Sequence, residues 1–127
     1  ILKEQYEIAK ILDLKFQANS LISLINLFYN NKTNNLNNEN NLYDLINYLD
    51  ELFNIYKKLN NLDGQLFASQ FLANIYHRNG QLKNAIEYYL LNIELYAVNS
   101  INLTANYENY KISLFNLSNC YKKVKNY

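Results

Sequence analysis

The chain has 127 residues, half of them hydrophobic, with 13 tyrosines, 6 phenylalanines and a formal net charge of +1. This length and apolar content exclude a disordered chain and are enough for one domain with a substantial core. The near-neutral charge gives no global field to attract nucleic acid or a membrane surface, and no apolar run approaches the roughly 20 residues that cross a bilayer.

Few residues in the chain can interrupt a helix, because it has no proline and only two glycines. We therefore expect an all-α protein. Its one cysteine, Cys120, cannot form an internal disulfide, which favours a reducing compartment and a cytoplasmic location. The chain begins at Ile1 and lacks methionine, so we expect it to be a fragment of a longer protein.

The first two predicted helices cover residues 1–17 and 18–29. Apolar residues recur in each at three- and four-residue intervals, which places them on one side of a helix. In the first the stripe is Leu2, Tyr6, Ala9, Leu12 and Phe16, and in the second it is Leu21, Leu24, Ile25 and Phe28.

An asparagine-rich stretch, NNKTNNLNNENN, follows at residues 30–41. Asparagine competes with its own backbone for hydrogen bonds and is poor in a helix interior, so this stretch is predicted to be a loop. A tolerant spacer and a functional loop both remain open.

The next helix is predicted over Leu42–Asn60, and we interpret it as the second helix of an earlier repeat. Residues 61–64 form a turn, with Asp63 as a cap for the following helix. The stripe of the predicted helix is Leu45, Leu49, Leu52, Ile55 (or Tyr56) and Leu59.

Two amphipathic segments meet at Gly80 within residues 68–96. Asn79-Gly80 supplies a left-handed residue that ends the first helix, and so short a connection makes the second helix pack antiparallel against it. This predicts a helical hairpin. Its two stripes are Phe71, Leu72, Ile75 and Tyr76, then Leu82, Ala85, Ile86, Tyr89, Ile93 and Tyr96.

The hairpin resembles a tetratricopeptide repeat (TPR) over residues 66–98, on the sequence LANIY at 72–76, Gly80, Leu82 and AIEYY at 85–89. It departs from the family at Ser69, where a large aromatic is usual, and at Ala97, where a proline usually ends the second helix. Leu117–Tyr121 repeats Leu72–Tyr76 after 45 residues, which makes residues 103–127 the first helix and turn of the next repeat. The resemblance implies one domain over residues 1–127, a TPR-like α-solenoid of about six helices stacked as antiparallel hairpins in a right-handed superhelix.

Long repeats in an Asn-, Lys- and Tyr-rich chain are most similar to the peptide-sensing regulators of low-GC Gram-positive bacteria, the PlcR, NprR and Rap group. That resemblance covers residues 42–127 and implies a cytoplasmic quorum-sensing domain. It implies a short signalling peptide in the groove, a homodimer whose packing responds to the peptide, and a DNA-binding helix-turn-helix outside this chain. No direct nucleic-acid or membrane contact is expected from residues 1–127.

The resemblance also places the first helix of each repeat along a concave groove, so the face opposite the packing stripe is the candidate peptide-binding site. An asparagine carboxamide can pair with both the N–H and the C=O of an extended peptide without burying a charge. Gln70 stands where the family's carboxylate clamp has a lysine, which argues against a chaperone-type site. The candidate residues are Phe67, Gln70, Asn74, His77, Arg78, Phe115, Asn116, Asn119 and Lys122.

No motif in the sequence indicates catalysis. It has no phosphate-binding glycine loop, no His-Glu-x-x-His pair and no paired cysteines, so we expect neither an enzyme nor a cofactor or metal site. His77 is predicted on an exposed helix face and Cys120 as a buried structural thiol. The alternative function is a TPR scaffold that joins proteins without a peptide effector.

Overall fold

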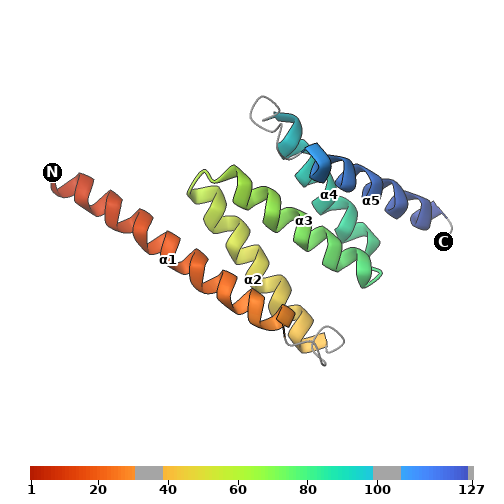
Figure 1. Ribbon diagram of the computed structural model, residues 1–127, viewed down its shortest axis with the longest axis horizontal. Helices are drawn as coiled ribbons and strands as arrows, with labels where there is room; N and C mark the ends of the chain where they lie inside the picture. Colours follow the sequence, from red (N-terminus) through yellow and green to blue (C-terminus); the bar gives the residue numbers. More distant parts are fainter. Residues whose placement is uncertain (31–38, 99–106, 126–127) are drawn as a thin grey trace. The chain divides into compact units, whose positions relative to one another are not determined.

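The structure, a computed structural model, describes residues 1–30, 39–98 and 107–125, and every element in these ranges is an α-helix. The five helices are α1 (Leu2–Asn30), α2 (Glu39–Lys58), α3 (Leu62–Arg78), α4 (Leu82–Val98) and α5 (Tyr107–Lys125). Helices that follow one another pack together in two compact units, residues 1–61 and residues 62–127 (Figure 1). None of the described helices is long and apolar enough to cross a membrane.

The first unit holds α1 and α2, which lie antiparallel (Figure 1). The ring centroids of Phe28 and Tyr48 are 5.7 Å apart across this pair. The predicted stripe of α2 is confirmed, because Leu45, Leu49, Leu52 and Ile55 are buried.

The prediction of two helices over residues 1–29 was wrong, since α1 runs unbroken for 29 residues. No glycine or proline lies between Phe16 and Leu21, and nothing there forces a break. In a continuous helix, nine residues make two and a half turns, so Phe16 and Ile25 face opposite ways. Ile25 is 3% exposed, while Phe16 is 71% exposed.

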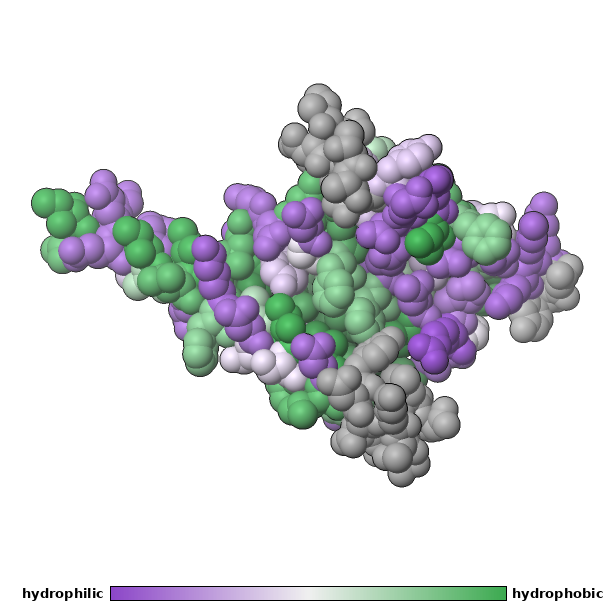
Figure 2. Space-filling model, viewed as in Figure 1, coloured by the Kyte–Doolittle hydropathy of each residue, from purple (hydrophilic) through white to green (hydrophobic). Residues whose placement is uncertain are grey.

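The first predicted stripe is therefore uncovered. Leu2, Tyr6, Leu12 and Phe16 all remain exposed, and only the second half of α1 contributes buried residues, at Ala18, Leu21 and Ile25. Figure 2 shows green apolar residues interspersed with purple polar ones over the free end of α1.

The Asn-rich loop prediction falls largely outside the described residues. Of residues 30–41, Asn30 ends α1, and α2 begins at Glu39, so the last three residues of the expected loop are helical. Residues 31–38 lie outside the description.

The turn at Gly80 is confirmed, and a second turn of the same kind ends α2. Gly80 has a φ of 76° and Asn60 a φ of 53°, both in the left-handed region. The N–H of Gln81 bonds to the carbonyl of Tyr76, and the N–H of Asn61 bonds to that of Tyr56, each at 2.9 Å. Both are Schellman motifs, which satisfy the last carbonyls of a helix.

The sequence carries this relation as well: LFNIYKKLNNL at 52–62 matches LANIYHRNGQL at 72–82, a correspondence that the sequence analysis missed. Asp63 does not precede α3 as a cap but lies within its first turn, because the helix begins at Leu62.

The second unit holds α3, α4 and α5. Helix α4 is antiparallel to α3, as predicted, since Tyr88 stacks on Tyr76 while Asn92 bonds to Ser69. It is antiparallel to α5 too, because Ser113 bonds to Asn92 and Tyr110 meets Tyr96. Helices α3 and α5 therefore run parallel to each other, and both pack against α4. One hydrophobic cluster of this unit joins Ala73, Leu82, Ala85, Tyr89, Leu117 and Cys120, and another joins Leu66 with Tyr96.

Candidate functional site

The candidate site residues all come from α3 and α5. Side chains link these two helices directly: the amide of Gln70 donates to the Ser113 hydroxyl at 3.3 Å and to the Asn109 carbonyl at 3.4 Å. Toward their C-terminal ends, Lys123 Nζ lies 3.1 Å from His77 Nε2. Gln70 thus lies in the seam between the helices.

A buried polar network centred on α4 fixes the positions of α3 and α5. Asn92 donates to the Leu66 carbonyl and to the Ser69 hydroxyl, both at 3.0 Å, and accepts from the Ser113 hydroxyl at 2.8 Å. Asn92, Ser69 and Ser113 are fully buried, and no buried polar side-chain atom of the described residues lacks a partner. Ser69, noted as a departure from the TPR pattern, is needed here because a large aromatic would displace the Asn92 side chain.

A second network gathers around Tyr89 of α4. Its hydroxyl donates to Asn74 Oδ1 at 2.5 Å, lies 3.5 Å from His77 Nδ1 and is hydrogen-bonded by Asn116. Burial is the main cause that raises the pKa of this phenol, so it remains a neutral donor. Tyr89 therefore brings three of the candidate residues, Asn74, His77 and Asn116, to one place.

His77 was predicted on an exposed helix face, but it is partly buried between Tyr89 and Lys123. Its ring meets that of Tyr89 edge-on, with centroids 6.1 Å apart. Burial, followed by the charge of Lys123, lowers the pKa of His77. The neutral ring accepts a hydrogen bond from Lys123 at Nε2, so Nδ1 carries the proton and points it toward Tyr89.

The remaining candidates lie at the surface, apart from Asn119, which is half-buried. Phe67 packs edge-on against Phe71, with ring centroids 5.6 Å apart, and is still 47% exposed. Arg78, Phe115 and Lys122 are exposed. The structure thus separates eight of the nine candidates into a seam group (Gln70, Asn74, His77, Asn116) and a surface group (Phe67, Arg78, Phe115, Lys122), and the half-buried Asn119 belongs to neither.

Four positions repeat between α3 and α5 with the same 45-residue offset and on the same side of each helix. An acid, an apolar residue, a carboxamide and a cation follow in order along each one. We call this set the binding face; its pairs are Asp63/Glu108, Phe67/Ile112, Asn74/Asn119 and Arg78/Lys123. Because α3 and α5 are parallel, each pair lies at a similar height in the unit.

Electrostatics gives the binding face a direction. Both carboxylates lie in the first turns of α3 and α5, and both cations lie in the last turns, as the helix dipole favours. Glu108 also pairs with Lys111 at 2.9 Å. Among the described residues, no group of three or more His, Cys, Asp and Glu side chains gathers to hold a metal ion.

Comparisons with known proteins add no family to this picture. The chain matches no protein-family model, no curated protein and no solved structure. The internal repeat, which relates α3 to α5 at an offset of 45 residues, is therefore used to compare the surfaces of these two helices.

The sequence analysis missed two residues that organise the site, Asn92 and Ser113, and it placed Tyr89 on an apolar stripe without its polar contacts. Asn92 had a visible signal, because it follows Tyr89 by three residues and precedes Tyr96 by four, on the stripe of α4. A carboxamide at such a position must have buried partners. Ser113 had a weaker signal, as the equivalent of Ala68.

Proposed function

We propose that this chain is part of a TPR-like α-solenoid and that its binding face holds a short linear peptide. The observation that carries the proposal is the matched order of acid, apolar residue, carboxamide and cation on two parallel helices. An extended peptide lying along them has its amino end near Asp63 and Glu108, and its carboxylate near Arg78 and Lys123. Phe67 and Ile112 supply apolar contact between the ends.

The spacing of the charges sets the size of the ligand. From Asp63 to Arg78 a helix rises about 22 Å. An extended chain covers that distance in about seven residues. Asn74 belongs to both the seam group and the binding face. Its hydrogen bond with Tyr89 holds its carboxamide in one orientation, which reduces the entropy lost on binding.

This proposal includes the finer expectation that the peptide is a signal and that the chain belongs to a bacterial transcription regulator. Its support is the resemblance of residues 42–127 to the PlcR, NprR and Rap group. The helix-turn-helix would lie outside these residues. The competing function is a scaffold that joins proteins and has no peptide effector.

The test is a titration of the chain with a library of heptapeptides, each made with a free and with an amidated carboxyl end. Tight binders should prefer the free carboxylate. Replacing Arg78 or Lys123 with alanine should remove that preference and weaken binding about tenfold, or about 1.4 kcal/mol. Lys83→Ala removes another exposed cation, from α4, and is the control.

Binding that ignores the carboxyl end, or that Lys83→Ala weakens as much as Arg78→Ala does, would contradict the proposed orientation. The absence of any heptapeptide binder would favour the scaffold.

A further inference from the structure

The two cations of the binding face have different surroundings. Arg78 is exposed in the last turn of α3, whereas the ammonium of Lys123, its equivalent in α5, lies 3.1 Å from Nε2 of the partly buried His77. His77 is the one histidine of the chain. The end of the binding face that carries the cations therefore also holds the one imidazole that can gain a proton near neutral pH.

His77 is approached from both of the helices that share its unit. From α4 the Tyr89 hydroxyl lies 3.5 Å from Nδ1, with the two rings edge-on, and from α5 come the Lys123 ammonium and, beside Lys123, the buried thiol of Cys120. Arg78 is the neighbouring charge on α3 itself. Burial and then the charge of Lys123 lower the pKa of His77, and no carboxylate of the described residues offsets them. The surroundings of the ring thus favour its neutral form.

The contact with Tyr89 decides which nitrogen changes when the ring gains a proton. Nδ1 already carries its proton toward Tyr89, whose hydroxyl is held in turn by Asn74 and Asn116. A proton from the solvent therefore adds to Nε2, which changes from the acceptor of the Lys123 hydrogen bond into a donor. Two positive donors then face each other, and like-charge repulsion opposes this state in the free chain.

A carboxylate satisfies both of these donors. One of its oxygens accepts a hydrogen bond from His77 Nε2, the other accepts from the Lys123 ammonium, and its negative charge removes the repulsion between the two cations. The neutral ring, in contrast, presents a lone pair at Nε2, which repels a carboxylate oxygen and keeps the Lys123 ammonium engaged. The protonated form of His77 is therefore the better receptor for an anion.

We propose that His77, Lys123 and Arg78 form a proton-linked carboxylate site, in which the binding of an ionised carboxylate is coupled to the uptake of one proton at Nε2 of His77. This inference rests on the proposed function, because the binding face places the carboxyl end of a linear peptide beside Arg78 and Lys123. A ligand that prefers the protonated form raises the pKa of His77, and by linkage a fall in pH strengthens its binding by the same factor. Acidification thus favours the bound state.

The titration of His77 can be followed without interference, because no other histidine is present in the 127 residues. In a chain made with isotope-labelled histidine, the midpoint of the imidazole signals in an NMR titration is the pKa of this residue. The probe is N-acetylglycine, whose carboxyl group resembles the end of a peptide and is ionised above about pH 5. The controls are N-acetylglycinamide, its neutral counterpart, and sodium chloride at equal ionic strength.

N-acetylglycine should raise the midpoint of the His77 titration in a saturable way, whereas N-acetylglycinamide and sodium chloride should not. Its affinity, measured from the backbone amide signals, should be higher near pH 5.5 than near pH 8 by about tenfold or more. His77→Gln should make the affinity equal at the two pH values, because glutamine does not titrate.

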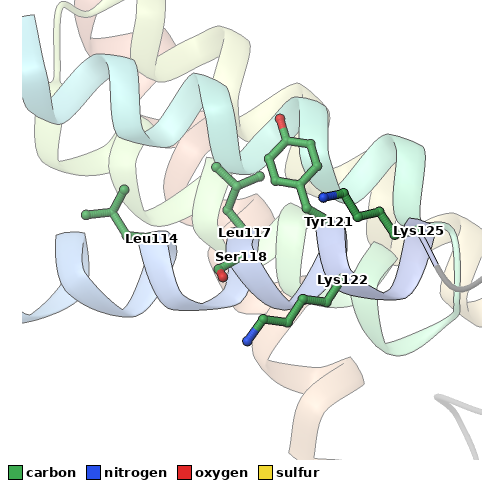
Figure 3. A pocket seen from close by; sticks show the side chains of 6 residues that line it. All are labelled: Leu114, Leu117, Ser118, Tyr121, Lys122 and Lys125. Carbon is green, nitrogen blue, oxygen red and sulfur yellow. The ribbon is translucent and has the colours of Figure 1, made fainter.

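Lys123→Met should weaken the binding of N-acetylglycine near pH 5.5 by about tenfold, the effect of losing one charge-assisted hydrogen bond. Lys125→Met is the matched control, since Lys125 is an exposed cation of the same last turn. Figure 3 shows Lys125 beside the Tyr121 ring at a separate hollow of about 380 Å³, which neither His77 nor Lys123 lines. The control substitution should leave the affinity unchanged.

A His77 midpoint that is the same in N-acetylglycine and in sodium chloride would overturn the proposal, as would equal effects of Lys123→Met and Lys125→Met. A heptapeptide that binds equally well at the two pH values would overturn the proton coupling and leave the proposed function intact. If N-acetylglycine raises the midpoint while no heptapeptide binds, the carboxylate site stands and the proposed function is wrong.

Discussion

Ser113 of α5 donates a 2.8 Å hydrogen bond to Asn92 of α4, and both side chains are fully buried. The same carboxamide donates two bonds to α3, so one side chain connects all three helices of the second unit. Buried polar networks of this kind are costly when incomplete and specify one arrangement when complete. Here the network sets the spacing of α3 and α5, and therefore the width of the binding face.

Asn92→Leu should be strongly destabilising although leucine is similar in volume. The substitution removes the three buried hydrogen bonds of Asn92 and takes away the acceptor of the Ser113 hydroxyl, although Ser69 can still donate to the Leu66 carbonyl. We expect a cost of about 2–4 kcal/mol. Urea unfolding followed by circular dichroism measures it. Asn84→Leu, at an exposed position of the same helix, should change the stability by less than about 0.5 kcal/mol; equal effects of the two substitutions would show that the network contributes nothing.

His77 should make the stability depend on pH near neutrality. Its pKa in the folded chain is lowered from 6.5 by burial and by Lys123, so the unfolded chain takes up the proton first as the pH falls. The contribution of His77 to the free energy of unfolding is fully present above about pH 6.5. It is lost progressively as the pH falls through that value toward the lower pKa of the folded state.

Unfolding free energies at pH 7.5, 6.5 and 5.5 check this, with His77→Gln as the comparison. Glutamine can still accept a hydrogen bond from Lys123 but does not titrate. The stability of the His77→Gln variant should therefore vary less over this pH range than that of the wild-type chain. If the wild-type chain is more stable at pH 5.5 than at pH 7.5, the pKa of His77 is not lowered by folding and the prediction is wrong.

Cys120 should react slowly with thiol reagents in the folded chain. It is fully buried, and burial raises the pKa of its thiol, so little thiolate is present near pH 8.5. Labelling should be slower than in urea by on the order of a hundredfold or more, because it requires the unit to open. The variant Ser118→Cys gives an exposed thiol in the same helix, and a similar rate at both positions would contradict the burial of Cys120.

Gly80→Ala should cost about 1 kcal/mol through the backbone alone. The residue has a φ of 76°, and an added Cβ would meet no atom within 4 Å, so the expected loss comes from the left-handed conformation. Gly80→Asn should cost less, because asparagine already adopts this conformation at Asn60 in the matching turn. Thermal unfolding of the two variants measures the difference, and equal losses would point to a cause other than φ.

Local patterns were enough to predict much of this fold. The Gly80 turn, the buried stripe of α2 and the antiparallel pairing of α3 with α4 depend on residues close in sequence, where periodicity and glycine are informative. The prediction of two helices over residues 1–29 was wrong because the apolar residues move to another side of the helix near Ala18, and this shift was interpreted as the boundary between two helices. The apolar residues before Ala18 do follow a helical period, but on the side that faces away from α2.

The sequence indicated which positions of the two repeats correspond, but not which side chains the candidate residues would contact. The 45-residue repeat placed Asn74 and Asn119 at equivalent positions from sequence alone. That Gln70 would bond to Ser113, and His77 to Lys123, depends on how closely α3 and α5 approach each other. This approach is set by side chains of α4, above all Asn92 and Tyr89, which no pattern within α3 or α5 contains.

The uncovered half of α1 has a consequence for how the chain melts. Residues 2–16 have a helical backbone but expose almost all of their side chains, and an isolated helix of that length is marginal in water. Their helicity should be lost gradually on warming, before the packed helices unfold together. Circular dichroism will therefore show a steep pretransition slope, and midpoints taken from helicity will fall below those taken from Cys120 accessibility.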